Sequence, residues 1–223
     1  MATTTKQAKK TTRKVKREEV INAYMQYVLE NGQEPETVYV LCKELGILEK
    51  EFYKHFGSLS GLQKMLWKDM VSKPVEICRS DEKFEEFSAR EKLLAFYYTM
   101  IESLSDNRTF ILWSLKPAAR PEPDPAILSE AKKVFLEFCQ EVIITGIETE
   151  EIIDRPVLGK RYRDAMWIQF LFVIQFWRKD DSPAFELTDA AIEKAVNLSF
   201  ELMGKSALDT MVDFGKFLYQ NRG

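Results

Sequence analysis

Residues 41–56 constrain the fold of this chain more than any other stretch, because they have the pattern of two short helices joined by a tight turn. Apolar side chains recur from position 38 through this stretch at spacings of three and four, which places them on one helical face. These are Val38, Leu41 and Leu45, then Phe52 and Phe56. Gly46, between the two sets, can adopt the left-handed conformation that ends a helix. The spacing predicts a helix-turn-helix, whose second helix normally enters the DNA major groove.

This part of the chain resembles the TetR family of bacterial transcription regulators over roughly residues 17–72. The family's Tyr-x-His-Phe signature appears as Tyr53-Lys54-His55-Phe56. A helix predicted from Arg17 to Asn31 precedes the signature, and a fourth helix is predicted to follow from about Ser58 or Ser60 to Ser72. We expect Pro74 to end that fourth helix or to start the next short turn, because proline disfavours the helical conformation in the residue before it.

The chain departs from the usual family pattern in three ways. Leu48 stands where a Ser or Thr usually caps the second helix of the motif, and Lys50-Glu51 stands where Gly-Thr is common. Leu59 replaces a lysine that usually contacts phosphate. The second helix, predicted over 49–56, therefore presents two acids, Glu49 and Glu51, beside its cations. A carboxylate repels phosphate, although it can accept a hydrogen bond from cytosine N4.

The resemblance implies an all-α fold with two domains. We expect a three-helix DNA-binding domain over residues 17–57, and a larger helical domain for ligand binding and dimerisation over 58–223. Helical spacing continues along the rest of the chain, without a convincing run of alternating β-branched residues. Ser88 and Glu91 form a capping box that predicts the start of a helix, and Thr188 is predicted to cap another.

A basic arm precedes the predicted helix-turn-helix. Residues 1–17 carry seven cationic and no acidic side chains, whereas the whole chain has a net charge of −3. We predict residues 1–16 to be a disordered arm that either follows a phosphate backbone or reaches the minor groove. Its charge alone is equally consistent with a solubilising tail, and its position before the motif favours DNA.

The residues expected to contact DNA lie in this arm and in the second helix of the motif. They are Lys14, Lys16, Arg17, Glu49, Lys50, Tyr53, Lys54 and His55. Among them, Tyr53, Lys54 and His55 are predicted to bind phosphate, with Lys50 the best candidate for a guanine edge. His55 could instead cap a helix end.

Two groups of apolar residues in the larger domain have a functional and a purely structural interpretation. The first would line a pocket for an unidentified small apolar ligand: Tyr97, Met100, Phe110, Trp113, Phe135 and Phe138. The second would form a homodimer interface, as in TetR-like proteins: Met166, Phe170, Ile174, Trp177, Ala195 and Leu198. Aromatic residues at helical spacing are usually core, and a wide apolar arc also suits a central helix packed on several sides.

The sequence gives little support to other classes of protein, such as enzymes, metalloproteins and membrane proteins. His55 is the only histidine, so a catalytic or metal site built on several histidines is excluded, and we expect no catalytic residue, no metal and no cofactor. Cys42, Cys78 and Cys139 are isolated, which is typical of buried thiols in a reducing cytoplasm. The chain lacks an apolar stretch long enough to span a bilayer and shows no secretory signal. We therefore expect a cytoplasmic protein.

These observations predict a DNA-binding transcriptional regulator, by family resemblance a ligand-responsive repressor. It would bind double-stranded DNA as a homodimer on a pseudo-palindromic operator. The alternative is a lipid- or small-molecule-binding module that keeps the fold and has lost specific DNA binding. Glu49, Glu51 and Leu59 favour the alternative, whereas the basic arm and the intact signature favour DNA. An enzyme is a distant third.

Overall fold

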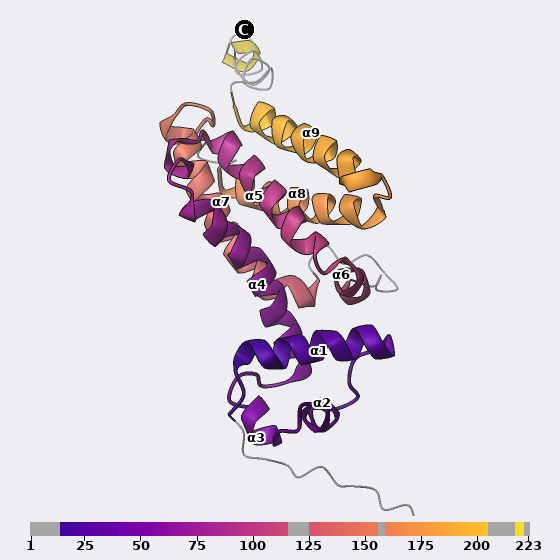
Figure 1. The fold of residues 1–223 in the computed structure, drawn as a ribbon. Coiled ribbons are helices and arrows are strands. Elements are labelled where there is room, and N and C mark those ends of the chain that lie inside the picture. Colours follow the sequence, from indigo (N-terminus) through magenta and orange to yellow (C-terminus); the bar gives the residue numbers. More distant parts are fainter. Residues whose placement is uncertain (1–13, 116–124, 156–158, 205–216, 221–223) are drawn as a thin grey trace, which may run out of the picture. The chain divides into compact units, whose positions relative to one another are not determined.

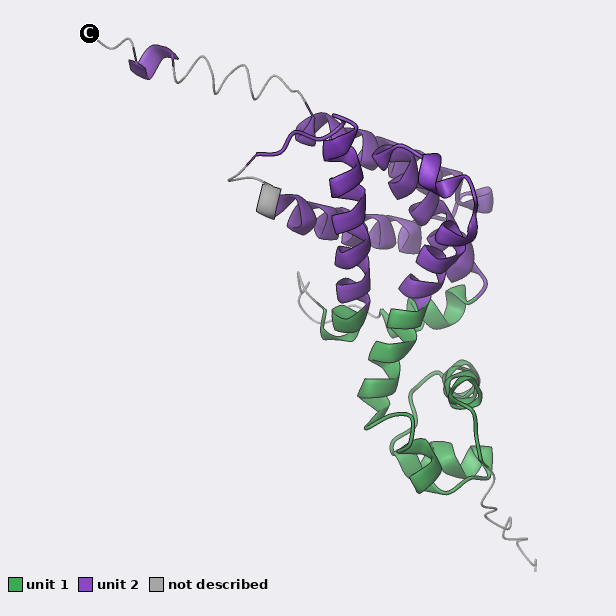
Figure 2. Ribbon diagram, turned by 90° about the vertical axis from the view of Figure 1, so that its left-hand side faces the viewer, with its two compact units in different colours: residues 1–69, 107–130 green, residues 70–106, 131–223 purple. Residues whose placement is uncertain are grey.

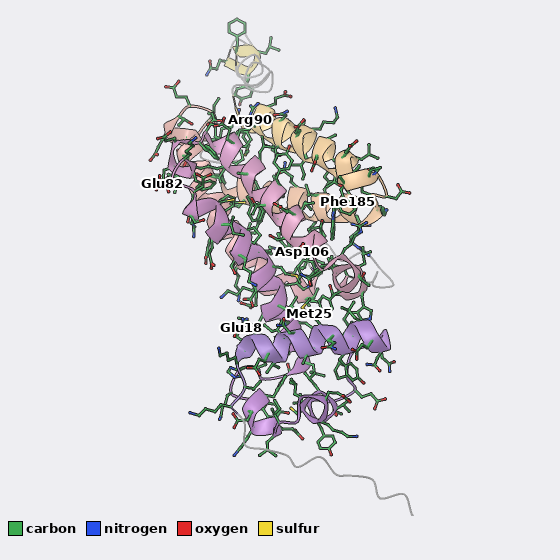
Figure 3. The ribbon with its side chains drawn as sticks, viewed as in Figure 1. Glu18, Met25, Glu82, Arg90, Asp106 and Phe185 are labelled. Carbon is green, nitrogen blue, oxygen red and sulfur yellow. The ribbon has the colours of Figure 1, made fainter. Side chains whose placement is uncertain are left out.

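The computed structural model describes residues 14–115, 125–155, 159–204 and 217–220, and over these ranges it is helical without a β-strand (Figure 1). The predicted all-α class is confirmed. The chain divides into two compact units (Figure 2), one formed by residues 1–69 and 107–130, the other by residues 70–106 and 131–223. Side chains fill the interior of each unit (Figure 3).

The first unit is built on α1, which spans Arg17–Asn31 and has the predicted bounds. It ends at Gly32, whose φ of 68° allows its N–H to donate to the Val28 carbonyl. Around α1 lie α2 (Val38–Leu45), α3 (Glu49–Phe52), the first half of α4 (Leu59–Ser80), α6 (Arg108–Ser114) and the 3₁₀ turn η2 (Ala126–Leu128).

Helix α6 packs with α1 in this first unit, although the sequence suggested that it belongs to the larger domain. The Phe110 ring meets Tyr24 of α1 edge-on at 6.2 Å between centroids. The Trp113 indole N–H donates to the Gly32 carbonyl over 3.0 Å. The segment that follows α5 thereby covers α1 and helps to bury its apolar face.

Helix α4 runs through Pro74 to Ser80, so the prediction that Pro74 ends it is wrong. A proline inside a helix leaves the carbonyl four residues earlier, here that of Met70, without its usual N–H partner. Pro74 is buried between Val71 and Val75, which are also buried. Burial of these side chains offsets the lost hydrogen bond, a tertiary effect that local sequence rules do not include.

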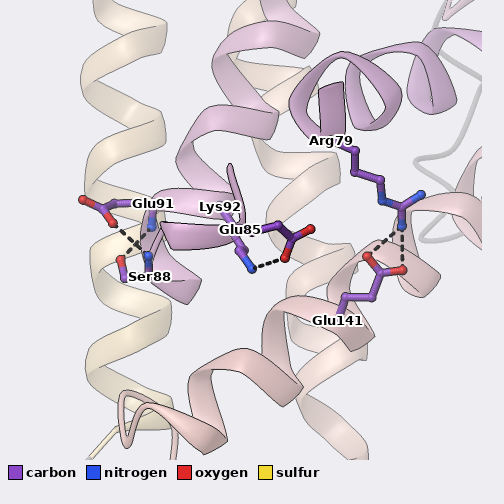
Figure 4. A network of polar contacts seen from close by, with 6 residues as sticks. All are labelled: Arg79, Glu85, Ser88, Glu91, Lys92 and Glu141. Atoms are coloured by element: carbon purple, nitrogen blue, oxygen red, sulfur yellow. Dashed lines mark hydrogen bonds and ion pairs between the residues drawn. The ribbon is translucent and has the colours of Figure 1, made fainter. Parts of the chain in front are cut away.

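The second unit contains η1 (Phe84–Glu86), α5 (Ala89–Ser105), α7 (Ser129–Glu148) from residue 131 onward, α8 (Gly159–Lys179), η3 (Pro183–Phe185) and α9 (Glu186–Met203). The predicted capping box at the start of α5 is confirmed, since Ser88 and Glu91 each accept a hydrogen bond from the other's backbone N–H (Figure 4). Figure 4 also shows the ion pairs of Arg79 with Glu141 and of Lys92 with Glu85.

Both ends of α9 are held by side chains outside the helix. At its start, the Asp180 carboxylate accepts hydrogen bonds from the backbone and hydroxyl of both Ser182 and Thr188. Thr188 is therefore a donor within the first turn and not the predicted cap. At the other end, the Arg155 guanidinium donates to the carbonyls of Leu202, Met203 and Gly204.

Candidate nucleic-acid interface

The turn between α2 and α3 has the geometry of a helix-turn-helix. Thr37 caps α2 by accepting a hydrogen bond from the Val40 N–H over 3.3 Å. Gly46 ends the helix with a φ of 64°, a conformation that costs glycine little. The N–H of buried Ile47 donates to the Cys42 carbonyl over 3.0 Å, which closes the turn and directs the chain into α3.

Helix α3 is shorter than predicted, because it covers only Glu49–Phe52 and then continues as hydrogen-bonded turns to Phe56. Its N-cap is Leu48, which provides no side-chain hydrogen bond, as expected for a residue without a polar atom. Phe52 and Phe56 are both buried, with ring centroids 5.7 Å apart, and fix this segment against the rest of the unit.

The acidic residues of α3 are less exposed than the sequence suggested. Glu51 was expected to point outward, but it is buried, and the Lys54 ammonium contacts both of its carboxylate oxygens at 2.7 and 2.8 Å. The hydrogen bond from Lys54 holds the pKa of Glu51 below its usual value. The expected phosphate contact of Lys54 therefore competes with an existing ion pair. The negative charge of Glu51 is compensated by the Lys54 ammonium.

The remaining polar side chains of α3 and its turn face solvent. Lys50, Lys54 and His55 are exposed, Tyr53 is 52% exposed, and Glu49 is partly exposed. Surface aromatic and cationic groups of this kind can contact phosphates and base edges. The side chains of α3 and the following turn that were predicted to contact DNA thus share one segment that is exposed or partly exposed. Glu51, which was not among them, is buried.

The last residues of the basic arm lie against this segment. The His55 ring nitrogen Nε2 is 2.9 Å from the Val15 carbonyl oxygen. Arg17 forms an ion pair with Asp69 at 2.6 Å, and its guanidinium lies 5.6 Å from the centre of the Phe56 ring. Both contacts join positions far apart in the sequence, so no local pattern could have indicated them. Residues 1–13 of the predicted arm lie outside the described residues.

The side chains predicted to line a ligand pocket are divided between the two units. Phe110 and Trp113 pack in the first unit, whereas Tyr97, Met100, Phe135 and Phe138 are buried in the second. Phe135 lies at the centre of an aromatic cluster, with ring centroids 4.7 Å from Phe170 and 5.4 Å from Phe96. Sequence spacing showed that these rings are apolar and internal, but it did not show which unit holds each.

Four of the six side chains predicted at a dimer interface are buried inside the single chain. Figure 3 shows how closely side chains fill this unit, and these four belong to its core: Met166, Phe170, Ile174 and Trp177. Of the other two, Ala195 is partly exposed and Leu198 is exposed. Helix α8 instead exposes Ile168 and Phe172, and α9 exposes Leu202 beside Leu198. One side of the wide apolar arc of α8 thus packs in the core, and the other side is exposed to solvent.

The model of a known protein family matches residues 92–218, more than half of the chain, and is described as the tetracyclin repressor-like, C-terminal domain. The chain belongs to the tetracyclin repressor-like family. The match begins within α5 and lies outside the helix-turn-helix, so the family assignment and the geometry of the first unit are independent observations. A search of curated proteins found no match to this family member.

A solved structure supports the fold of this tetracyclin repressor-like protein. It is a protein with unknown function from Rhodococcus sp. RHA1, 12% identical in sequence, with a TM-score of 0.53 over 85% of this chain and 95% of that chain. At this identity the likeness concerns the fold alone. Within the described ranges, no helix is long and apolar enough to cross a membrane, and no three His, Cys, Asp or Glu side chains are grouped so as to hold a metal ion.

Proposed function

We propose that this protein is a DNA-binding transcriptional regulator of the tetracyclin repressor-like family. The observation that carries the proposal is the helix-turn-helix of the first unit, with an exposed α3 segment, in a chain whose second unit matches the family's C-terminal domain. In this proposal Lys50 of α3 and Tyr53, which directly follows that helix, contact DNA, and Lys14 and Lys16 contribute charge from the arm. The regulator would work in the cytoplasm, where its DNA is.

The charge of the exposed segment supports this proposal. Pairing with Lys54 removes Glu51 from the acids that would face phosphate, and only Glu49 remains partly exposed on α3. Two unpaired acids would have opposed a polyanion. One partly exposed acid next to Lys50 is compatible with base readout, because a carboxylate can accept from cytosine N4.

We further propose that the regulator is a homodimer that uses the exposed apolar side chains of α8 and α9. Ile168, at 67% exposure, and Phe172 come from α8, and Leu198 and Leu202 come from α9. Exposed side chains of this size favour association with a second apolar surface. A two-fold dimer would place two helix-turn-helix units on a pseudo-palindromic operator.

Regulation by a small apolar ligand is part of the same proposal, and the aromatic interior of the second unit supports it. A ligand can shift such a protein only if it binds one of two conformations more tightly than the other. Repression relieved by ligand would follow if the conformation with lower DNA affinity binds the ligand better.

A second candidate is a ligand-binding module of the same fold without specific DNA binding. Leu59 favours it, since this partly exposed residue begins α4 where the family usually provides a cation for phosphate. The two candidates share the second unit and differ in what the first unit does.

Binding to DNA from immediately upstream of the protein's own gene separates them. We expect selective binding, measured by fluorescence anisotropy against a scrambled competitor, that weakens steeply with salt because phosphate contacts release counterions. Lys50→Ala should weaken it, whereas Lys73→Ala, a change at an exposed lysine of the second unit, should not. Weak binding that the scrambled competitor abolishes equally well would refute the regulator. Mass spectrometry of copurifying small molecules would then be the next measurement.

A further inference from the structure

A hydrogen-bonded chain of three side chains crosses the interior of the second unit. The Tyr97 hydroxyl of α5 donates to the Gln169 Oε1 atom of α8 over 3.2 Å, and the Gln169 Nε2 atom donates to the Ser199 hydroxyl of α9 over 2.9 Å. Tyr97 is fully buried, and Gln169 is 7% exposed. One buried amide therefore joins three helices.

Tyr97 fixes which end of the Gln169 amide faces α9. Burial raises the pKa of the Tyr97 hydroxyl well above its usual value, so this group keeps its proton and can donate. Its hydrogen bond engages the amide oxygen, which leaves the amide N–H₂ group to bind Ser199. The contact between α8 and α9 is thus oriented from α5.

The polar chain lies at the same level of α8 and α9 as the exposed apolar side chains proposed for association. Gln169 directly follows Ile168, and Ser199 directly follows Leu198. Ile168 is 67% and Leu198 is 57% exposed. Successive helical positions point about 100° apart, so each polar residue faces inward from the turn that presents the apolar one. The hydrogen bond from Gln169 to Ser199 holds the two helices together at this level.

A buried amide is more selective than apolar contacts about how two helices sit against each other. Apolar burial is non-directional and changes little when a helix slides slightly, whereas a hydrogen bond weakens steeply once its geometry departs from the optimum. Displacement of α9 along α8 would leave the buried Gln169 N–H₂ group without its acceptor, which is costly away from water. Single buried polar residues fix the register of packed helices in this way.

We propose that Gln169 is a positioning residue for the association surface: by binding Ser199 it fixes the placement of α9 against α8, and so keeps Ile168 and Leu198 in one apolar face that fits a second copy of this chain. The inference rests on the proposed homodimer. It gives Gln169 a function separate from stability, because an apolar residue of the same size could fill the same interior.

A variant with unchanged stability tests that separation. Tyr97→Phe combined with Gln169→Met replaces both members of the buried pair with apolar groups of similar size, so the thermal midpoint should be kept. Analytical ultracentrifugation should show a dimer dissociation constant raised at least about 5-fold, because a dimer contains two copies of the lost hydrogen bond. Ser199→Ala, which removes only the partly exposed acceptor, should weaken the dimer similarly.

Tyr98→Phe is the matched control. The Tyr98 hydroxyl donates to Glu193 over 3.2 Å, so this variant also removes a hydrogen bond between α5 and α9 but leaves α8 and α9 joined. Its dimer dissociation constant should stay within about 2-fold of that of the unchanged protein. An equal loss in Tyr98→Phe and in the double variant would overturn the specific role of Gln169.

A distance measurement within one subunit keeps the proposal separate from the proposed homodimer. Spin labels at Ile168→Cys and Leu198→Cys report the spacing of α8 and α9 by pulsed electron paramagnetic resonance, with labelled protein diluted in unlabelled protein. The native cysteines are buried. We expect a narrow distance distribution that broadens or shifts when the double substitution is added.

The two measurements together decide the outcome. An unchanged distance distribution would overturn the proposal even if the protein dimerises, and so would an unchanged dissociation constant in a protein that dimerises. A changed distribution in a protein that is monomeric in ultracentrifugation would uphold the positioning by Gln169 and refute the proposed homodimer.

Discussion

Replacing Glu51 with glutamine should increase affinity for DNA by releasing a cation. In the structure the Lys54 ammonium lies 2.7 and 2.8 Å from the two carboxylate oxygens, and the Glu51 side chain is 5% exposed. Glutamine has the same shape and keeps an oxygen acceptor but carries no charge. Lys54, whose side chain is 55% exposed, would then be able to turn toward a phosphate.

The size of the effect follows from counterion release. Each additional phosphate contact makes the slope of log K against log salt more negative by about 0.9. Glu51→Gln should therefore steepen the slope by about 0.9 per subunit, so that the change in affinity between ~50 and ~200 mM salt grows by about 3.5-fold per subunit. Fluorescence anisotropy at four or five salt concentrations measures this slope.

Glu49→Gln is the matched control, since it removes the same charge from the same helix but releases no lysine. We expect it to raise affinity slightly with an unchanged slope. The opposite change, Lys54→Ala, leaves the Glu51 carboxylate buried without its partner and should lower the thermal midpoint. If Glu51→Gln leaves the slope unchanged while the protein remains folded, Lys54 makes no phosphate contact and the reasoning fails.

Three further changes test the packing, the helix cap and the association surface. Phe135→Ala should lower the free energy of unfolding by about 3–5 kcal/mol in urea titrations, because it empties the centre of the aromatic cluster; a loss below about 1 kcal/mol would contradict its central position. Burial alone would raise the pKa of Asp180, but its hydrogen bonds lower it to about 2, so its stabilising effect is present above about pH 4 and disappears as the pH falls toward 2. Asp180→Asn should therefore lower the thermal midpoint at neutral pH and reduce the difference between pH 4 and pH 2, and an unchanged difference would refute this role. Ile168→Glu combined with Phe172→Glu should convert dimers to monomers in analytical ultracentrifugation without reducing helicity, and persistent dimers would place the interface elsewhere.

Local signals in the sequence predicted the parts of the fold that depend on local interactions. The stop at Gly32, the turn at Gly46 and the capping box at Ser88 each involve a few neighbouring residues, and each is present in the structure. The orientation of Glu51 was missed, although Lys54 three residues later is at a spacing that favours an ion pair. From that spacing the ion pair of Glu51 with Lys54 could have been predicted.

The remaining differences arise from contacts between distant residues. The helix through Pro74 depends on burial of its neighbours, and the contact of His55 with Val15 joins positions 40 residues apart. The apolar face of α8 that contacts solvent could not be separated from the face that packs inside, because both are rich in large apolar residues. Only the positions of α5, α7 and α9 around α8 decide which side chains are covered.

The side chains of Asp180 and Arg155, which bind the two ends of α9, affect how this helix would take part in an interface. Helix ends normally fray, because their terminal N–H and C=O groups lack intrahelical partners. In α9 the Asp180 carboxylate accepts from the Thr188 N–H in the first turn and the Arg155 guanidinium donates to carbonyls at the end, and both charges also interact favourably with the helix dipole. Leu198 and Leu202 are consequently presented by a helix that is already ordered, so that association of two subunits would lose less conformational entropy than it would with a helix that has free ends.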